Sequence, residues 1–180
     1  MVRNKTFNNV IDSLKNLGAE HEMITTTTSG DIWEIDLKNT LFPLMHINPV
    51  NVQTGQATLT YNFQIFVMDL VSEREDWTQA NFQSANNLSN NQEVLNETLQ
   101  ICTDIIGMLR HSQWQSELTN DIDAPIIWGE GEFNIEPFSE RFDNEVTGWV
   151  FSLPVIVHND FQTCDIPVAI NPIIEPTSLT

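Results

Sequence analysis

The sequence predicts an α+β fold in which two amphipathic helices pack on one face of an antiparallel or mixed sheet. Apolar residues recur at helical spacing over 7–17 and 94–109, and they alternate with polar residues over 57–67 and 146–157. Strands that follow one another through turns favour antiparallel pairing. Two helices suffice for only one face of such a sheet, so the class is α+β.

The first forty residues predict a helix, a turn and a strand. The helical stripe consists of Phe7, Val10, Ile11, Leu14 and Leu17. Gly18 can end this helix in a left-handed conformation. After a turn at 29–31, apolar and acidic residues alternate over 33–37, which predicts a half-buried strand with an acidic outer face. Its apolar positions are Trp33, Ile35 and Leu37, set between Glu34 and Asp36.

The strongest strand pattern lies at 57–67, where only Phe66 breaks the alternation. Eleven residues that rise 3.3 Å each extend about 36 Å, so this strand could project past a compact core. The apolar segment before it, 41–47, contains Pro43. Proline has no N–H to donate, and we therefore do not expect Pro43 at a central position of the sheet.

A second helix is the clearest helical pattern, and it should pack along the sheet. Its stripe is Val94, Leu95, Leu99, Cys102, Ile105, Ile106 and Leu109. Asn90 stands three residues before Glu93, as in a capping box. If this stripe is core, Leu99→Ala should cost about 2–5 kcal/mol.

Short apolar runs at 126–128 and 133–135 precede a last strong strand at 146–157. Trp149, Phe151, Leu153, Val155 and Val157 share one face of this strand. Pro154 within it indicates a sheet edge or a bulge.

Two segments carry apolar residues that no periodicity assigns to the core. The polar loop 72–92 contains Trp77 and Phe82, and these aromatic rings either anchor a partner or cap the domain's own core. The domain therefore spans 1–165 with an interaction loop at 72–92, and 166–180 forms an extended C-terminal arm. The arm's apolar residues, which lie along a sheet edge or a neighbour, are Ile166, Ile170, Ile173 and Ile174.

The net charge of the chain limits the classes of partner that it can bind. The chain has 25 Asp+Glu against 7 Lys+Arg, a formal net charge of -18 at pH 7. Such a surface repels nucleic acid phosphates and anionic membranes. No run approaches the roughly 20 apolar residues of a membrane helix, and the N-terminus does not resemble a signal peptide. We expect no tight DNA binding and no membrane partner.

The sequence contains no pattern typical of catalysis or metal binding. Nucleotide-binding glycine loops, the zinc-protease motif and the nucleophile-elbow motif are all missing. Acidic pairs such as Asp121 and Asp123 are expected by chance in so acidic a chain. Cys102 falls within a helical apolar stripe, where a buried hydrophobe is expected, and His21 is expected at the surface. We therefore expect no enzyme: no catalytic residue, no cofactor and no metal.

Several stretches together resemble a family of virion proteins of tailed bacteriophages, particularly the crAss-like phages that infect Bacteroidota. The stretches are 42–47 (FPLMHI), 61–69 (YNFQIFVMD), 93–101 (EVLNETLQI), 137–142 (PFSERF) and 147–149 (TGW). The likeness extends from about Val10 to Pro167. The order of helices and strands is also similar to that of tail-terminator and tail-completion proteins, which form rings at the head-proximal end of the tail.

The resemblance implies a non-enzymatic ring subunit of the virion neck or tail, in six or twelve copies, assembled in the bacterial cytoplasm. Its partners would be further copies of itself and adjacent neck and tail proteins. An acidic ring lumen would repel DNA and let the genome pass without tight binding.

Two alternatives remain open at this stage. The first is an acidic adaptor or host-modulating phage protein that binds one protein partner as a monomer or dimer. The second is a metal-dependent enzyme that uses the acidic loops. Native mass spectrometry separates a ring subunit from an adaptor, and metal analysis separates both from the enzyme.

Overall fold

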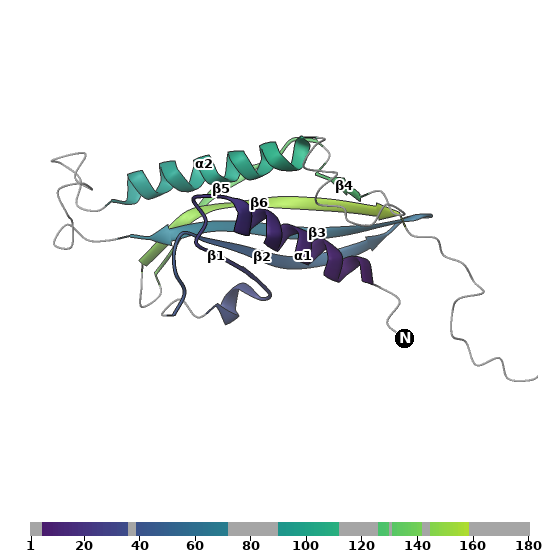
Figure 1. Cartoon of the computed structure of the whole chain (residues 1–180), viewed down its shortest axis with the longest axis horizontal. Coiled ribbons are helices and arrows are strands. Elements are labelled where there is room, and N and C mark those ends of the chain that lie inside the picture. The colour runs from purple at the N-terminus through teal and green to yellow at the C-terminus, as the bar shows by residue number, and fades with distance from the viewer. Residues whose placement is uncertain are drawn as a thin grey trace, which may run out of the picture.

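The computed structural model describes residues 5–35, 39–71, 90–111, 126–129, 131–141 and 145–158. It confirms the predicted α+β class, with two long helices and a mixed sheet (Figure 1). In chain order the elements are α1 (Lys5–Glu20), β1 (Thr26–Ser29), the 3-10 turn η1 (Ile32–Glu34), β2 (Leu44–Thr54), β3 (Thr58–Leu70), α2 (Asn91–Arg110), β4 (Ile126–Trp128), β5 (Ile135–Arg141) and β6 (Glu145–His158).

The sheet has six strands in the order β1-β2-β3-β6-β4, and β5 also pairs with β6. Among the described strands, β1 and β2 form the only parallel pair. The long strands β3 and β6 run antiparallel from the pair Thr58 and His158 to the pair Leu70 and Val146. On its other side, β6 pairs with β5 over 145–151 and with β4 over 155–157. The centre of the sheet is therefore formed by β2, β3 and β6.

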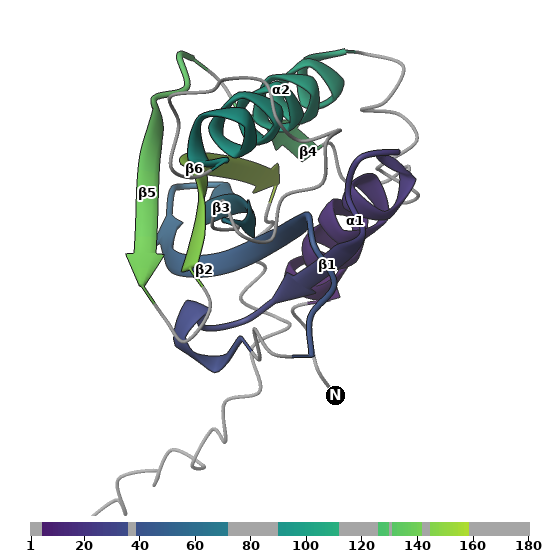
Figure 2. The same cartoon turned by 90° about the vertical axis from the view of Figure 1, so that its left-hand side faces the viewer.

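Both helices lie on the same face of the sheet, as the prediction required (Figure 2). α1 packs against β1 and β2, and α2 packs against β3 and β6. One continuous core lies between the helices and this face, because alternate side chains of each strand point into it. Its fully buried members include Val10, Leu14, Ile47, Ile65, Ile101, Ile105 and Val155.

The stripe predicted for the first helix is confirmed, but its predicted end at Gly18 is wrong. The helix continues to Glu20, and Gly18 is not among the glycines with positive φ. A Cβ at Gly18 would lie 2.5 Å from Thr27 Oγ1 and 2.8 Å from Met45 Sδ. Glycine is needed here because α1 approaches β1 and β2 closely, and not because the chain turns.

The second helix has the predicted position but a slightly rotated buried face. Leu95 and Leu99 are half-buried, whereas Thr98 and Ile101, which the prediction left out, are buried. The Thr98 hydroxyl donates to the Val94 carbonyl at 2.6 Å, which lets a polar residue occupy the core side. The expected capping box is also wrong, since the Asn90 side chain makes no capping hydrogen bond. Leu99→Ala should therefore cost less than the lower end of the range expected for a buried leucine.

The strand expected over 33–37 is wrong, although the turn at 29–31 is present. The strand β1 comes before this turn, and η1 comes after it. Asp31 begins η1, and its carboxylate accepts a hydrogen bond from the Trp33 N–H at 3.1 Å. This cap favours a tight turn over an extended strand, and it leaves the Trp33 side chain 73% exposed. Asp36 and Leu37 lie outside the described residues.

Three prolines mark places where strand pairing is interrupted. Pro43 precedes β2, and its carbonyl accepts from the N–H groups of Thr25 and Thr26. Pro154 lies inside β6, which pairs with β3 without a register shift, so the expected bulge is wrong. The expected edge is present locally, because neither β4 nor β5 pairs with β6 at Pro154. Its carbonyl accepts from Gly129 N at 3.0 Å, which shows that its nitrogen also points toward β4 and β5. There it faces the gap between their two pairing regions, where no N–H is needed.

Pro49 interrupts the outer side of β2. The Ile47 carbonyl accepts from Gly30 N on the β1 side, and residues two apart in a strand point their backbone groups the same way. The nitrogen of Pro49 therefore points to the outer edge, beyond the end of β1. The register between β2 and β3 also shifts between Pro49 and Asn51.

The predicted interaction segments lie mostly outside the described residues. This applies to 72–89 of the expected loop and to the whole arm 166–180. At the end of the expected loop, Asn91 and Gln92 belong to the first turn of α2.

Candidate functional site: the helix-free face of the sheet

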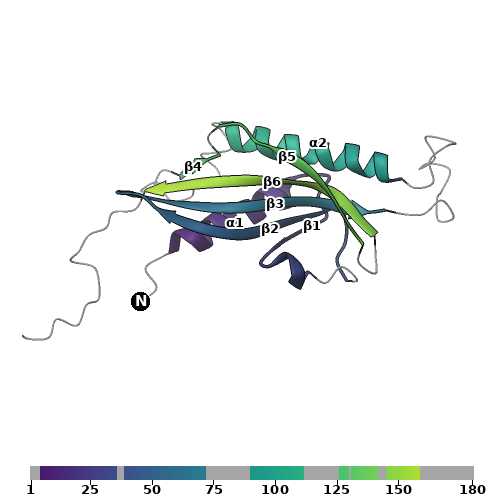
Figure 3. The ribbon, with the colours of Figure 1, turned by 180° about the vertical axis from the view of Figure 1, so that it is seen from behind.

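The helix-free face is the side of β2, β3 and β6 opposite α1 and α2 (Figures 1 and 3). Strand register places its residues in cross-strand rows. On β2 they are Leu44, His46, Asn48, Asn51 and Gln53; on β3 they are Thr58, Thr60, Asn62, Gln64, Phe66 and Met68; on β6 they are Val146, Gly148, Val150, Ser152, Pro154 and Ile156.

One end of this face is closed. Leu44, His46, Met68 and Val146 are all buried there, and the segment that contains η1 lies on this side of the sheet (Figure 2). Phe66 contacts Phe138 of β5 edge to face, with ring centroids 5.5 Å apart. The closed end therefore forms a small second core.

His46 fixes the segment after β1 to the closed end. Its Nδ1 lies 2.8 Å from the Thr28 hydroxyl, and its Nε2 lies 3.1 Å from the Gly30 carbonyl. A neutral ring with the proton on Nε2 satisfies both partners, because it donates to the carbonyl and accepts from the hydroxyl. Burial lowers the pKa of His46, against smaller opposing effects of the Gly30 carbonyl and the Asp31 charge. The ring thus serves as a neutral structural link.

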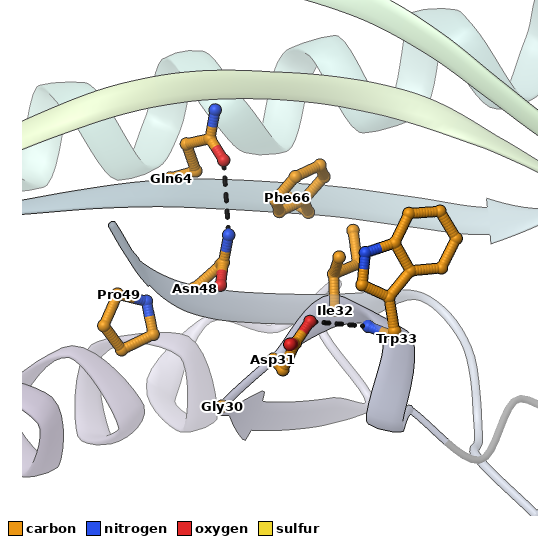
Figure 4. A pocket seen from close by; sticks show the side chains of 8 residues that line it. All are labelled: Gly30, Asp31, Ile32, Trp33, Asn48, Pro49, Gln64 and Phe66. Carbon is orange, nitrogen blue, oxygen red and sulfur yellow. Dashed lines mark hydrogen bonds between the residues drawn. The ribbon is translucent and has the colours of Figure 1, made fainter. Parts of the chain in front are cut away.

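The other end of the face is open and is covered with amide and hydroxyl side chains. Asn48 Nδ2 donates to Gln64 Oε1 at 3.2 Å, and Asn62 Nδ2 donates to Asn51 Oδ1 at 2.7 Å. Each bond joins β2 to β3 across the sheet surface. Figure 4 shows Asn48 and Gln64 pointing toward one another between Pro49 and Phe66.

A hollow of about 520 Å³ lies above this amide pair, on the β2 side. The residues after β1 form its wall, and Trp33 stands at its border (Figure 4). Its lining residues are Gly30, Asp31, Ile32, Trp33, Asn48, Pro49, Gln64 and Phe66. The hollow combines an exposed aromatic ring with uncharged hydrogen-bonding groups, which is the composition of a protein contact surface.

A second hollow of about 270 Å³ lies on the opposite side of Gln64, toward β5. Phe133 forms part of its wall, and the Arg110 guanidinium lies 4.9 Å from the centroid of that ring. Arg110 also donates to the Gly131 carbonyl, which ties the end of α2 to this segment. Asn134 Nδ2 donates to Glu136 Oε1 at 2.7 Å. Gln64 lines both hollows, which therefore adjoin at this side chain, and the two together are called the trough below.

Charge is distributed unevenly around this site. None of the positions of the helix-free face on β2, β3 and β6 holds Asp, Glu, Lys or Arg. Acidic residues occur only at the borders of the trough, as Asp31, Glu132 and Glu136. The neighbouring strand β5 places Glu136 in the same row as Val150, so in a chain with 25 Asp+Glu the uncharged part of this face is limited to β2, β3 and β6.

The described residues contain no group of three or more His, Cys, Asp or Glu that could hold a metal ion. Cys102 is buried in the core, and burial raises the pKa of its thiol to about 12. His21 was expected at the surface, but its side chain is only 9% exposed, and its Nε2 lies 3.6 Å from Asp104 Oδ2. It therefore links the end of α1 to α2. Within the described part of the chain, none of the helices has the length and apolar character needed to cross a membrane.

The interface residues predicted from the sequence are Trp77, Phe82, Ile166, Ile170, Ile173 and Ile174, and all of them lie outside the described residues. The prediction missed Trp33, Asn48 and Gln64. A usable signal was present, because the alternate positions 58–64 hold only Thr, Asn and Gln. An uncharged outer face on a long strand could have been recognised as a contact surface.

The sequence matches no known protein-family model and no curated protein.

Proposed function

We propose that this protein is a non-enzymatic structural subunit of a ring in the neck or tail of a tailed bacteriophage. In this role it joins head-proximal and tail components of the virion, around a channel through which DNA passes. The observation that carries the proposal is the open part of the helix-free face, which holds no charged residue on β2, β3 and β6 in a chain of net charge -18. Such a face supports repeated protein contact in the assembled particle.

The resemblance to phage virion proteins supports the same proposal. The stretches that carry it fall on the framework of the fold: 42–47 at the start of β2, 61–69 on β3, 93–101 on α2, the described part 137–141 of the fourth stretch on β5, and 147–149 on β6. These elements include all the strands at the centre of the helix-free face.

The charge of the chain supports passage of DNA without tight binding. The excess of acidic residues repels phosphates, whereas a basic lumen would hold DNA through counterion release. In a gel shift at low salt, the purified protein should not bind double-stranded DNA at submicromolar concentration. Binding that weakens with added salt would contradict an acidic channel.

Mass photometry and native mass spectrometry of the purified chain test the ring, alone and with the adjacent neck and tail proteins. We expect species of six or twelve copies, either in solution or on the neighbouring ring. A reconstruction of the virion neck and tail should then place the chain in a closed ring. A chain that stays monomeric or dimeric, and ignores every virion component while binding another protein, would identify an adaptor instead.

A further inference from the structure

We propose that neighbouring subunits associate head to tail, with the helix-free face of one copy packed against the outer face of α1 of the next. This inference rests on the proposed ring function and assigns the two surfaces that form the subunit contact. One surface is the open part of the helix-free face, from Asn48 and Gln64 toward the β2–β3 turn. The other is the exposed side of α1, at Asn9, Asp12 and Asn16.

Repulsion between copies is the first reason. Each copy carries a formal net charge of -18, so close contact between two acidic surfaces is unfavourable. Copies can approach closely only where their surfaces carry little negative charge. The helix-free face meets this condition, because its positions on β2, β3 and β6 hold no charged residue.

The two helices differ in the same respect, and this identifies the second surface. In α1, Lys5 and Lys15 balance Asp12 and Glu20, so the helix has no net charge. In α2, three acids, Glu93, Glu97 and Asp104, outnumber the single cation Arg110. Arg110 is also engaged with Gly131 and Phe133 of its own chain. Of the two helices, α1 therefore carries the smaller net negative charge, and a second copy meets less repulsion there.

The side chains of the two surfaces are also complementary. The exposed asparagines of α1, Asn9 and Asn16, can hydrogen-bond the amides and hydroxyls of the sheet face. Lys15 is the half-buried cation that precedes Asn16 in α1, and the two hollows include the acids Asp31 and Glu136 among their lining residues. Asp12 lies between the two asparagines of α1, and Lys15 matches its charge within the same helix.

The two surfaces lie on opposite sides of the subunit, because α1 covers the other face of the sheet (Figure 2). A contact between different surfaces leaves one of each unused at the ends of a pair, so further copies add until the rotation closes a ring. α1 has 16 residues and is therefore about 24 Å long, which fits along the strands of the face. The contact thus has the symmetry that a ring requires.

Three matched double variants test this inference, and each adds two negative charges at exposed positions. Gln53→Glu with Ser152→Glu charges the helix-free face. Asn9→Glu with Asn16→Glu charges α1. Asn96→Glu with Thr103→Glu charges α2 and serves as the control, with the same net charge. Thermal melting first establishes that all three variants fold, and mass photometry then measures their assembly.

We expect the face variant and the α1 variant each to lose assembly by at least about tenfold in the assembled fraction, while the α2 control assembles like the unmodified chain. The decisive step is to mix the two deficient variants. The face variant keeps an intact α1, and the α1 variant keeps an intact face, so the mixture should form one-to-one pairs and nothing larger. Two-surface association is the arrangement that gives this result.

Other outcomes would overturn the inference in distinguishable ways. If the α1 variant still forms dimers by itself, two helix-free faces meet each other and the contact is symmetric. If both variants form complete rings, the subunit contact lies elsewhere, although the ring function stands. If the unmodified chain forms no ring, alone or with neighbouring virion proteins, the proposed function fails together with the inference.

Discussion

The two faces of the sheet are made from the same three strands and have opposite properties. On the helix-covered face, alternate residues such as Tyr61, Phe63 and Ile65 are buried under α1 and α2. On the helix-free face, the residues between them, such as Asn62 and Gln64, remain accessible and hydrogen-bond to asparagines of β2. One strand thus presents an apolar core side and a polar, accessible side.

This difference separates stability from assembly. Apolar area removed from water on the covered face contributes most of the folding free energy. The open part of the other face contributes little to folding, because its amides exchange hydrogen bonds with water for hydrogen bonds with each other. Substitutions should therefore affect either the fold or the assembly, according to the face that they change.

The largest loss of stability should come from a substitution of Gly148 at the closed end, where the helix-free face is buried like the helix-covered face. A Cβ on Gly148 would overlap the Val67 carbonyl oxygen and the Met68 Cα, which are backbone atoms of β3. Gly148→Ala should lower the free energy of unfolding by about 4 kcal/mol or more, as measured by urea titration. Gly107→Ala is the control, since a Cβ there meets no atom within 4 Å. Because Gly107 is helical, this change should stabilise the protein by about 0.5–1 kcal/mol.

A large effect is also expected from the covered face. Ile101 is fully buried between α2 and the sheet, so Ile101→Ala should cost about 2–5 kcal/mol in chemical denaturation. Gln64→Ala, on the opposite face, should cost less than about 1 kcal/mol. Equal losses for the two variants would contradict the division of roles between the faces.

A pH-dependent effect should arise from the closed end. The pKa of His46 is lowered by burial, so the unfolded chain takes up this proton at a higher pH than the folded chain. The stability contribution is therefore present above the ordinary pKa of 6.5 and is lost as the pH falls through the folded pKa. Urea midpoints of the unmodified protein and of His46→Gln, measured from pH 8 to pH 5, should converge toward low pH. Parallel curves would show that His46 does not titrate differently on folding.

The smallest effect on stability should come from Trp33, at the border of the trough. Its side chain is 73% exposed, and Trp33→Ala should change the free energy of unfolding by less than about 0.5 kcal/mol. Aromatic residues at interfaces often contribute 2 kcal/mol or more, so the same variant should weaken ring assembly in sedimentation. A marked loss of thermal stability with normal assembly would place Trp33 in the fold instead of the contact.

Much of the fold could be predicted because periodicity records which side of an element is buried. The first helical stripe and the buried positions of β3 and β6 were found in this way. The errors occurred where tertiary contacts override local patterns. Gly18 permits a close helix–sheet approach that resembles a helix end in sequence, and Asp31 caps a turn within an alternating segment.

The site was harder to predict for a different physical reason. An accessible amide such as Gln64 can hydrogen-bond either to water or to another protein. Composition alone therefore does not distinguish a solvent-exposed strand face from a protein interface. What distinguishes them is cross-strand register, which brings Asn48, Gln64 and Ser152 into one row. The side of the sheet that the helices leave open is likewise decided only by the packed structure.

The outer edge of β2 has a consequence for how copies of this chain can associate wrongly. Beyond β1, this edge continues toward Thr54 without a strand partner in the described chain, and unpaired edges attract strands of other molecules. Pro49 withholds an N–H at the start of that edge, and the register shift that follows it twists the backbone. Fibrous aggregation by extension of the sheet at this edge is therefore hindered, even where many copies of the chain are present at high local concentration.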